Sequence, residues 1–217
     1  MTTLQGAVVL VVGATGGLGS RIAAQLESRG AIVARAAKSL GHDLRESSVI
    51  HEVLDHTNAQ HGRLDGLVIA SGVVAFGAAS ELEPATVDEL FAVNTTGPIQ
   101  LIAQSQPYLE DSAREGREPF VVTLSGVVAE APVAGLAAYS ASKAGLAAFV
   151  VAAGREYRRA GIRLMDARPG HTGTALSGHP IAGSAPRFGD GLDPDMVAAR
   201  IILAIVDGEK DLPATSF

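Results

Sequence analysis

Short apolar runs alternate with amphipathic stretches along the whole chain. Five apolar runs have the pattern of strands buried on both faces, and they cover 7–12, 31–37, 64–70, 120–125 and 162–168. Between and after them, apolar residues recur at helical spacing, most clearly over 46–61, 86–92, 95–113, 138–160 and 194–207. This alternation predicts an α/β fold, a doubly wound parallel sheet with helices on both faces.

A glycine-rich turn follows the first apolar run. Gly13, Gly17 and Gly19 separate that run from a helical pattern that includes Ile22 and Leu26. Backbone N–H groups that no side chain covers, together with the positive end of a helix dipole, bind a pyrophosphate well. The turn therefore predicts a phosphate site. A glycine-rich turn without a ligand is the alternative, and the flanking strand and helix argue against it.

Other unusual residues stand where predicted strands end. Ser71-Gly72, Ser125 and Pro169-Gly170 each follow an apolar run, as the glycine turn does. In open parallel sheets the ligand lies beyond the carboxyl ends of the strands. We therefore expect these segments to meet around one ligand.

A tyrosine and a lysine stand one turn apart at the start of the helix predicted over 138–160. Tyr139 and Lys143 are four residues apart, so they share one helix face. A free tyrosine, with a pKa of about 10, is a poor acid–base at neutral pH. A nearby ammonium lowers that pKa, and a decrease of roughly two to three units would make Tyr139 a proton donor and acceptor for a carbonyl or alcohol. Such a pair alone is usually a surface pair. In a chain that also has a dinucleotide-binding turn, it favours an acid–base role.

Composition narrows the remaining possibilities. The chain has 217 residues, no cysteine and a net charge of −6. We expect a single domain over 1–217, in the cytoplasm, with neither nucleic acid nor membrane as a partner. No apolar run is long enough to predict a transmembrane helix, and no cluster of histidines and acids predicts a metal site.

Four motifs in order resemble the short-chain dehydrogenase/reductase family, whose fold is the Rossmann fold. They are the turn Gly13–Gly19, Asn94, the Tyr139–Lys143 pair, and Pro169-Gly170 with Thr174, and the likeness covers about 6–207. The resemblance implies that Tyr139 is the acid–base, that Lys143 holds the nicotinamide ribose and that Asn94 holds a water of the proton relay. It also implies a dinucleotide site formed by Gly13, Thr15, Gly17, Leu18, Gly19, Lys38, Asp43, Leu44, Ala70, Ser71, Gly72, Lys143, Pro169, Gly170, Thr172 and Thr174.

One departure from the family concerns the substrate oxygen. Where relatives have a serine that orients the carbonyl, this chain has Gly126, preceded by Ser125. Losing such a donor commonly costs about 10²–10³ in rate. Three alternatives follow: Ser125 replaces the serine, the substrate supplies its own orienting group, or most of the activity is lost.

The cofactor preference is predicted at the end of the second apolar run. An NAD site places a carboxylate there, whereas this chain has Ala37 followed by Lys38. NADP(H) is therefore the preferred cofactor, with Lys38 on its 2′-phosphate, and NAD(H) is the alternative. Arg35 is a weaker candidate because it lies two positions back and can face a helix.

The chain is also shorter than its relatives after this run. Only 38–42 separate Ala37 from Asp43, the residue expected at the adenine, and a parallel crossover needs about a dozen residues. We therefore expect the next edge strand to be lost and about six strands to remain, with at most a poor further strand near 211–217. A mobile loop at about 171–193 is expected to close on the substrate.

These expectations add up to an NADP(H)-dependent oxidoreductase that interconverts a ketone or aldehyde and an alcohol. A catalytically weakened dinucleotide-binding protein, a sensor or scaffold, is the alternative that Gly126 favours. The apolar excess of the helices at about 95–113 and 138–160 predicts a homodimer or homotetramer formed through them.

Overall fold

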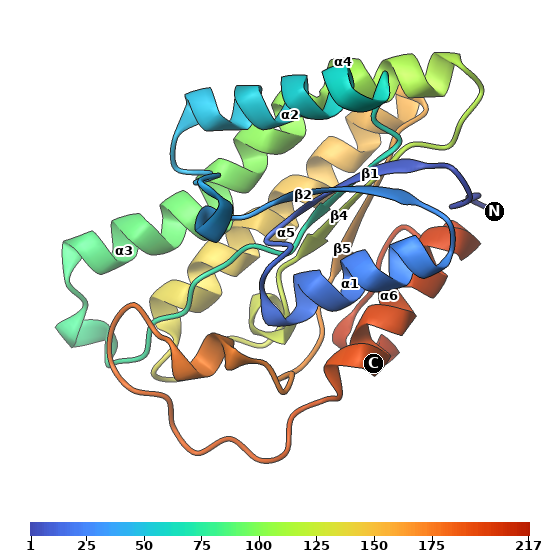
Figure 1. Ribbon diagram of the computed structural model, residues 1–217. Helices are drawn as coiled ribbons and strands as arrows, with labels where there is room; N and C mark the ends of the chain where they lie inside the picture. Colours follow the sequence, from blue (N-terminus) through green and yellow to red (C-terminus); the bar gives the residue numbers. More distant parts are fainter.

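The computed structural model describes residues 1–217, which form one parallel sheet between two layers of helices (Figure 1). The strands are β1 (Val8–Val12), β2 (Ile32–Ala36), β3 (Gly66–Ile69), β4 (Phe120–Leu124) and β5 (Arg163–Ala167). Their order in the sheet is β2-β1-β3-β4-β5, and every pair is parallel. The predicted fold class is confirmed.

Alternate residues of the central strands enter two separate cores. Val9, Val11 and Val122 face α1 (Gly17–Ser28) and α6 (Pro194–Asp207). Leu10 and Val121 face α2 (Ser47–His61), α4 (Gly97–Arg114) and α5 (Ala137–Tyr157). Because both faces are covered, the strands are apolar without alternation, as in the sequence.

The sheet has five strands, not the expected six. The edge strand expected to be lost is indeed missing: a short 3₁₀ turn at Lys38–Leu40 leads from β2 toward α2, and β2 forms the edge. At the other edge, Leu212 makes only an isolated bridge with Ala167. Pro213 follows at once and has no N–H for a ladder, which explains why no sixth strand forms.

A π-helical turn carries Asn94. It spans Ala92–Thr96 and joins α3 (Pro84–Phe91) directly to α4, where the sequence predicted two separate helices. Single π turns inside helices are frequent at functional sites. Here the wider turn faces α5, the helix that carries Tyr139 and Lys143.

α5 is the long apolar helix of the fold. By length and composition alone, Ala137–Ala160 passes for a membrane-crossing helix. In the structure its side chains Leu146, Val150 and Ala153 pack into the core beside β5. The core helix of a globular fold meets the same criterion of length and apolar composition.

Candidate active site

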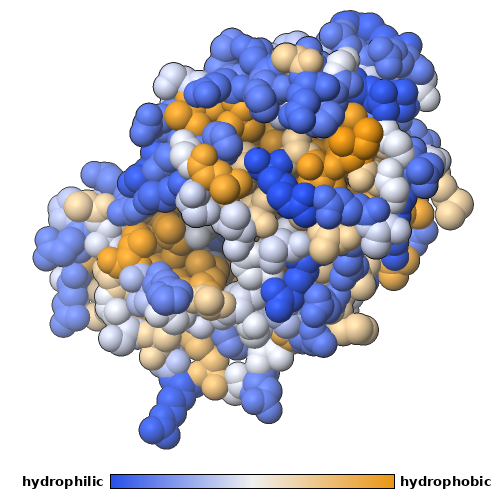
Figure 2. Space-filling model, in the orientation of Figure 1, coloured by the Kyte–Doolittle hydropathy of each residue, from blue (hydrophilic) through white to orange (hydrophobic).

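The carboxyl ends of the strands open into a cavity of ≈ 680 Å³. Figure 2 shows apolar side chains gathered on one side of a hollow near the segment 171–193. The cavity brings together nearly all the predicted site residues: the glycine turn, Lys38, Asp43, Leu44, Ala70, Ser71, Gly72, Ser125, Tyr139, Lys143, Pro169, Gly170, Thr172 and Thr174. Gly19 and Asn94 lie behind its wall.

The glycine turn is compact because its glycines touch backbone. A Cβ on Gly19 would lie 2.2 Å from the Gly13 oxygen, so Gly19 allows α1 to approach the turn. A Cβ on Gly17 would lie 2.6 Å from Cβ of Thr174, in the segment after β5. The start of α1 therefore meets Thr174 across a cradle that only glycine leaves open, as a pyrophosphate site requires.

The far end of the cavity is polar. Thr15 and Ser39 share a hydrogen bond of 2.8 Å, and Lys38, with 69% of its side chain exposed, lies 3.9 Å from Asp43. Arg45 holds the Asp43 carboxylate at 2.5 Å and keeps its pKa below the usual value. Arg35 instead forms two hydrogen bonds with Glu27 of α1, so it faces a helix and not the cavity.

Two buried polar atoms of the cavity wall have no partner in the protein. They are Nδ1 of His42 and Oγ of Ser71. Buried polar groups normally have a hydrogen-bond partner, so both atoms fit a ligand with polar groups of its own. The sequence interpretation named Ser71 but missed His42, whose only signal was its place beside Asp43. Together with the glycine cradle, these atoms fit a dinucleotide.

Asn94 uses its side chain to hold the backbone after β3. Oδ1 accepts a hydrogen bond from the Val73 N–H at 2.9 Å, and Nδ2 donates to the Val73 oxygen at 2.9 Å and to Ser142 at 3.1 Å. Both amide protons are therefore used inside the protein. A Cβ on Gly72 would lie 3.2 Å from Asn94 Oδ1 and from Lys143 Nζ, which places the three residues together.

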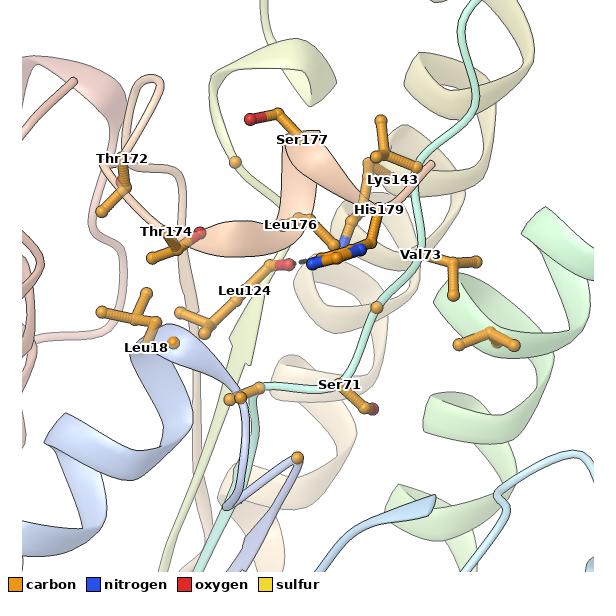
Figure 3. A pocket seen from close by; sticks show the side chains of 18 of the residues that line it. Leu18, Ser71, Val73, Leu124, Lys143, Thr172, Thr174, Leu176, Ser177 and His179 are labelled. Carbon is orange, nitrogen blue, oxygen red and sulfur yellow. Dashed lines mark hydrogen bonds between the residues drawn. The ribbon is translucent and has the colours of Figure 1, made fainter. Parts of the chain in front are cut away.

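Tyr139 and Lys143 share one face of α5, as predicted, but the expected lowering of the tyrosine pKa is not found. Lys143 Nζ donates a 2.8 Å hydrogen bond to the Leu124 oxygen (Figure 3). It lies 6.0 Å from the centre of the Tyr139 ring. Desolvation dominates and raises the pKa of Tyr139 to about 12. Burial also lowers the pKa of Lys143 to about 8, with Asp166 opposing that decrease.

The Gly126 position is shaped for glycine. Its φ of +78° and ψ of 166° are nearly exclusive to glycine, and the next residues form a 3₁₀ turn at Val127–Ala129. Ser125 is 1% exposed, and its hydroxyl donates to Asp166 Oδ2. Because a hydroxyl has one proton to donate, Ser125 offers none to a substrate oxygen in this arrangement.

An apolar wall stands beside Tyr139. Val74, Phe76 and Leu136 form a small buried cluster against it, and Phe188 lies 6.0 Å from Phe76, ring centre to ring centre. His171 stacks on Phe188 at 4.4 Å, and His179 points into the cavity from the turn Ala175–Gly178 (Figure 3). The sequence interpretation did not single out Val74, Phe76 and Leu136, because apolar residues in irregular segments have no periodicity to mark them.

Comparisons with known proteins agree with the fold and the motifs. The family model described as short chain dehydrogenase matches residues 7–181. A 2,3-dihydro-2,3-dihydroxybenzoate dehydrogenase of Escherichia coli (strain K12) is 31% identical over 134 residues, which span 62% of this chain and about half, 52%, of that enzyme. A cyclic-di-GMP-binding biofilm dispersal mediator protein of the same organism is 29% identical and spans 78% of this chain and 75% of its own.

Among solved structures, a 3-ketoacyl-(acyl-carrier-protein) reductase from Brucella melitensis complexed with NADH superposes with a TM-score of 0.88. It is 21% identical, and the superposition covers 97% of each chain. At that identity the likeness is one of fold. The family match over most of the chain shows that this protein belongs to the short-chain dehydrogenase family, a family of NAD(P)-binding oxidoreductases.

Restoring the family's serine by Gly126→Ser should not raise any turnover. The added side chain must adopt a φ of +78°, which costs about 1–3 kcal/mol and lowers Tm. Gly116→Ser, at a second positive-φ glycine with open space around it, is the stability control, and its Tm should fall as well. A tenfold gain in kcat at unchanged Tm would contradict this expectation.

Proposed function

We propose that this chain is an NADP(H)-dependent oxidoreductase that interconverts a ketone or aldehyde and an alcohol. One observation carries the proposal: Tyr139 and Lys143, on one face of α5, open into the same cavity as the glycine turn. A dinucleotide laid from that turn toward α5 would bring its reactive end to the tyrosine. The bound nicotinamide would supply or accept the hydride.

The chain's own residues would then move one proton. With its pKa raised to about 12, Tyr139 is protonated at neutral pH and suited to give its proton to the oxygen of a carbonyl as that carbon is reduced. In the reverse direction the phenolate takes the alcohol proton. Lys143, as an ammonium, would favour the phenolate. Asn94, whose amide is occupied, would hold a relay water through its main-chain oxygen.

The NADP(H) preference rests on charge at the end of β2. No carboxylate stands at Ala37 to bind a ribose 2′-OH. The Lys38 side chain is 69% exposed and its Nζ lies 3.9 Å from Oδ2 of Asp43, so Lys38 is free to turn from Asp43 to a phosphate. Ser39, Thr15 and His42 supply polar groups at the same end. NAD(H) is the alternative cofactor.

Ser125 cannot orient the substrate oxygen while its hydroxyl donates to Asp166. The lining near Tyr139 is mostly apolar, so either the substrate supplies its own donor or Ser125 must first release Asp166. We propose that the segment 171–193 closes the substrate end. The partner is then a small-molecule carbonyl or alcohol.

A second candidate function is a dinucleotide-binding sensor or scaffold with little turnover. The glycine conformation at Gly126 favours it, and so does the relative named for binding cyclic di-GMP. The positions of Tyr139 and Lys143 in the cavity favour the enzyme. Tight NADPH binding without reduction of any carbonyl in a broad panel would decide for the second function.

We further propose a single-domain protein of the cytoplasm that forms a homodimer or homotetramer through α4 and α5. The support is the apolar excess of these two helices, of which Val151 on α5, 55% exposed, is one example.

Tyr139→Phe should remove turnover and leave NADPH binding in place. Loss of the proton donor costs about 10²–10⁴ in kcat, while the ring still packs on its apolar neighbours. The measurements are NADPH oxidation with a carbonyl panel and NADPH titration by fluorescence. Tyr108→Phe, which removes an exposed hydroxyl on α4, is the matched control. A Tyr139→Phe protein with more than a tenth of the wild-type kcat would exclude Tyr139 as the acid.

Lys38→Ala should reduce the preference for NADPH over NADH by about tenfold, the worth of one charge-assisted contact of about 1.4 kcal/mol. NADPH and NADH Kd values measured side by side give the ratio. Lys210→Ala, outside the cavity, should leave it unchanged. Equal binding of both dinucleotides by the wild type would refute the NADP(H) proposal.

A further inference from the structure

An ionisable side chain lies buried behind the cavity, beside Lys143. Asp166 of β5 is only 2% exposed, and alternation along β5 directs it to the same side of the sheet as α5. A lone buried carboxylate is costly, so its partners must offset that cost. The mechanism proposed above makes no use of Asp166.

Two hydroxyls, one in β4 and one directly after it, bind this carboxylate. Thr123, directly opposite Asp166 in the sheet, donates to Oδ1 at 2.6 Å, and Ser125 donates to Oδ2. Thr123 is fully buried. Burial raises the pKa of Asp166, and the hydroxyls of Ser125 and Thr123 and the charge of Arg168 oppose that rise. The donors on both oxygens are those that an ionised carboxylate needs.

Arg168 also contacts Asp166, but its charge is shared among three acids. Its guanidinium lies 3.2 Å from Asp166 and 2.6 Å from Asp211, and it also bonds Glu130 of the turn after β4. The arginine side chain is 10% exposed. Because Glu130 and Asp211 already outweigh one guanidinium, the negative charge of Asp166 is left for another cation.

The second cation close enough to Asp166 to feel its charge is Lys143. Nζ donates to the oxygen of Leu124, and the two hydroxyls that bind the carboxylate belong to the residues on either side, Thr123 and Ser125. Lys143 is 5% exposed. An ammonium so far from water has too little solvation to stay charged on one carbonyl contact alone.

We propose that Asp166 is a positioning residue for the Tyr139–Lys143 pair: its carboxylate is the buried counter-charge that keeps Lys143 an ammonium at the floor of the cavity. Ser125 then serves to orient and stabilise that carboxylate. This assignment explains why the hydroxyl of Ser125, a residue of the cavity wall, donates to Asp166. Its catalytic meaning rests on the proposed function, whereas the charge of Lys143 can be measured without it.

Other ionisable groups face this region and must be considered in a pH experiment. Tyr139 lies one turn before Lys143 on α5, and His171 and His179 line the same cavity from the segment after β5. Arg168, Glu130 and Asp211 stand on the far side of Asp166. From the π-helical turn, Asn94 adds no charge.

The test is the titration of Lys143 in the protein without cofactor. The chain has only three lysines, Lys38, Lys143 and Lys210, so competitive acetylation from pH 6 to 10 with mass spectrometry follows each separately. In the wild type the midpoint of Lys143 should lie near 8. Removing an adjacent negative charge disfavours the ammonium, so Asp166→Asn should lower that midpoint by about one pH unit or more.

Asp211→Asn is the matched control. It makes the same chemical change on another partner of Arg168, at a side chain that is 58% exposed, and the Lys143 midpoint should stay where it is. Lys38 and Lys210 should be unmoved in every variant. An Asp166→Asn midpoint equal to that of the wild type would overturn the proposal, because a merely structural carboxylate would change Tm and not the titration.

A second variant covers the case in which Asp166→Asn does not fold. Asp166→Asn combined with Arg168→Gln removes both buried charges, and Arg168→Gln alone is its reference because the loss of a guanidinium itself raises the pKa of a nearby ammonium. The Lys143 midpoint of the double variant should lie below that of Arg168→Gln, and equal midpoints in these two variants overturn the proposal again.

NADPH binding gives a separate readout. The affinity for NADPH, measured as Kd against pH, should weaken above the Lys143 midpoint. In Asp166→Asn the pH at which binding weakens should move to lower pH, together with the acetylation midpoint of Lys143. If both move and no carbonyl is ever reduced, the counter-charge stands and the oxidoreductase proposal fails. If turnover is found and neither midpoint moves, the oxidoreductase proposal stands and the counter-charge proposal fails.

Discussion

The structure around the cavity depends on how one ammonium is kept out of water. Lys143 is held by a single main-chain oxygen of β4, in a site where burial already lowers its pKa to about 8. The same burial raises the pKa of Tyr139, so the two groups of the pair are pushed toward their neutral forms together. A site of this kind needs negative charge from its surroundings to keep the lysine in its cationic form, and a bound dinucleotide with negative phosphates would act in the same direction.

The turn after β4 contributes both to the charge around Lys143 and to the part of the cavity beside Tyr139. Gly126 takes a backbone conformation closed to serine, and Ser125 turns inward to Asp166. Neither residue therefore offers a side-chain donor to the cavity. The apolar cluster of Val74, Phe76 and Leu136 forms the side that would meet a substrate in the proposed function. A substrate oxygen finds few fixed donors here beyond Tyr139, which narrows the chemistry to molecules that orient themselves by shape or by their own polar groups.

Sequence patterns predicted the parts of this site that depend on local chain geometry. The apolar runs gave the strands because both sheet faces are covered, and the i, i+4 spacing gave the Tyr139–Lys143 face. The direction of the Tyr139 pKa was wrong because it depends on where Nζ points and on how much water remains, neither of which spacing determines. The contacts of Asp166 could not be predicted either, since they arise from strand register between β4 and β5, residues far apart in the chain.

The lost edge strand shows how such a shortening can be tolerated. β2 is left with one free edge, and Ile32 there is 45% exposed. Open edges invite pairing with other chains, and charge on the strand opposes it. Arg35, held by Glu27, places that charge on β2. The short turn that replaces the missing segment carries Lys38 and leads to His42 and Asp43, so the same deletion that exposes β2 also builds the polar end of the cavity from nearby residues. In the proposed function the shortening would bear on cofactor choice as well as on the fold, because Lys38, the group proposed to bind a 2′-phosphate, lies in the short turn beside the sheet edge.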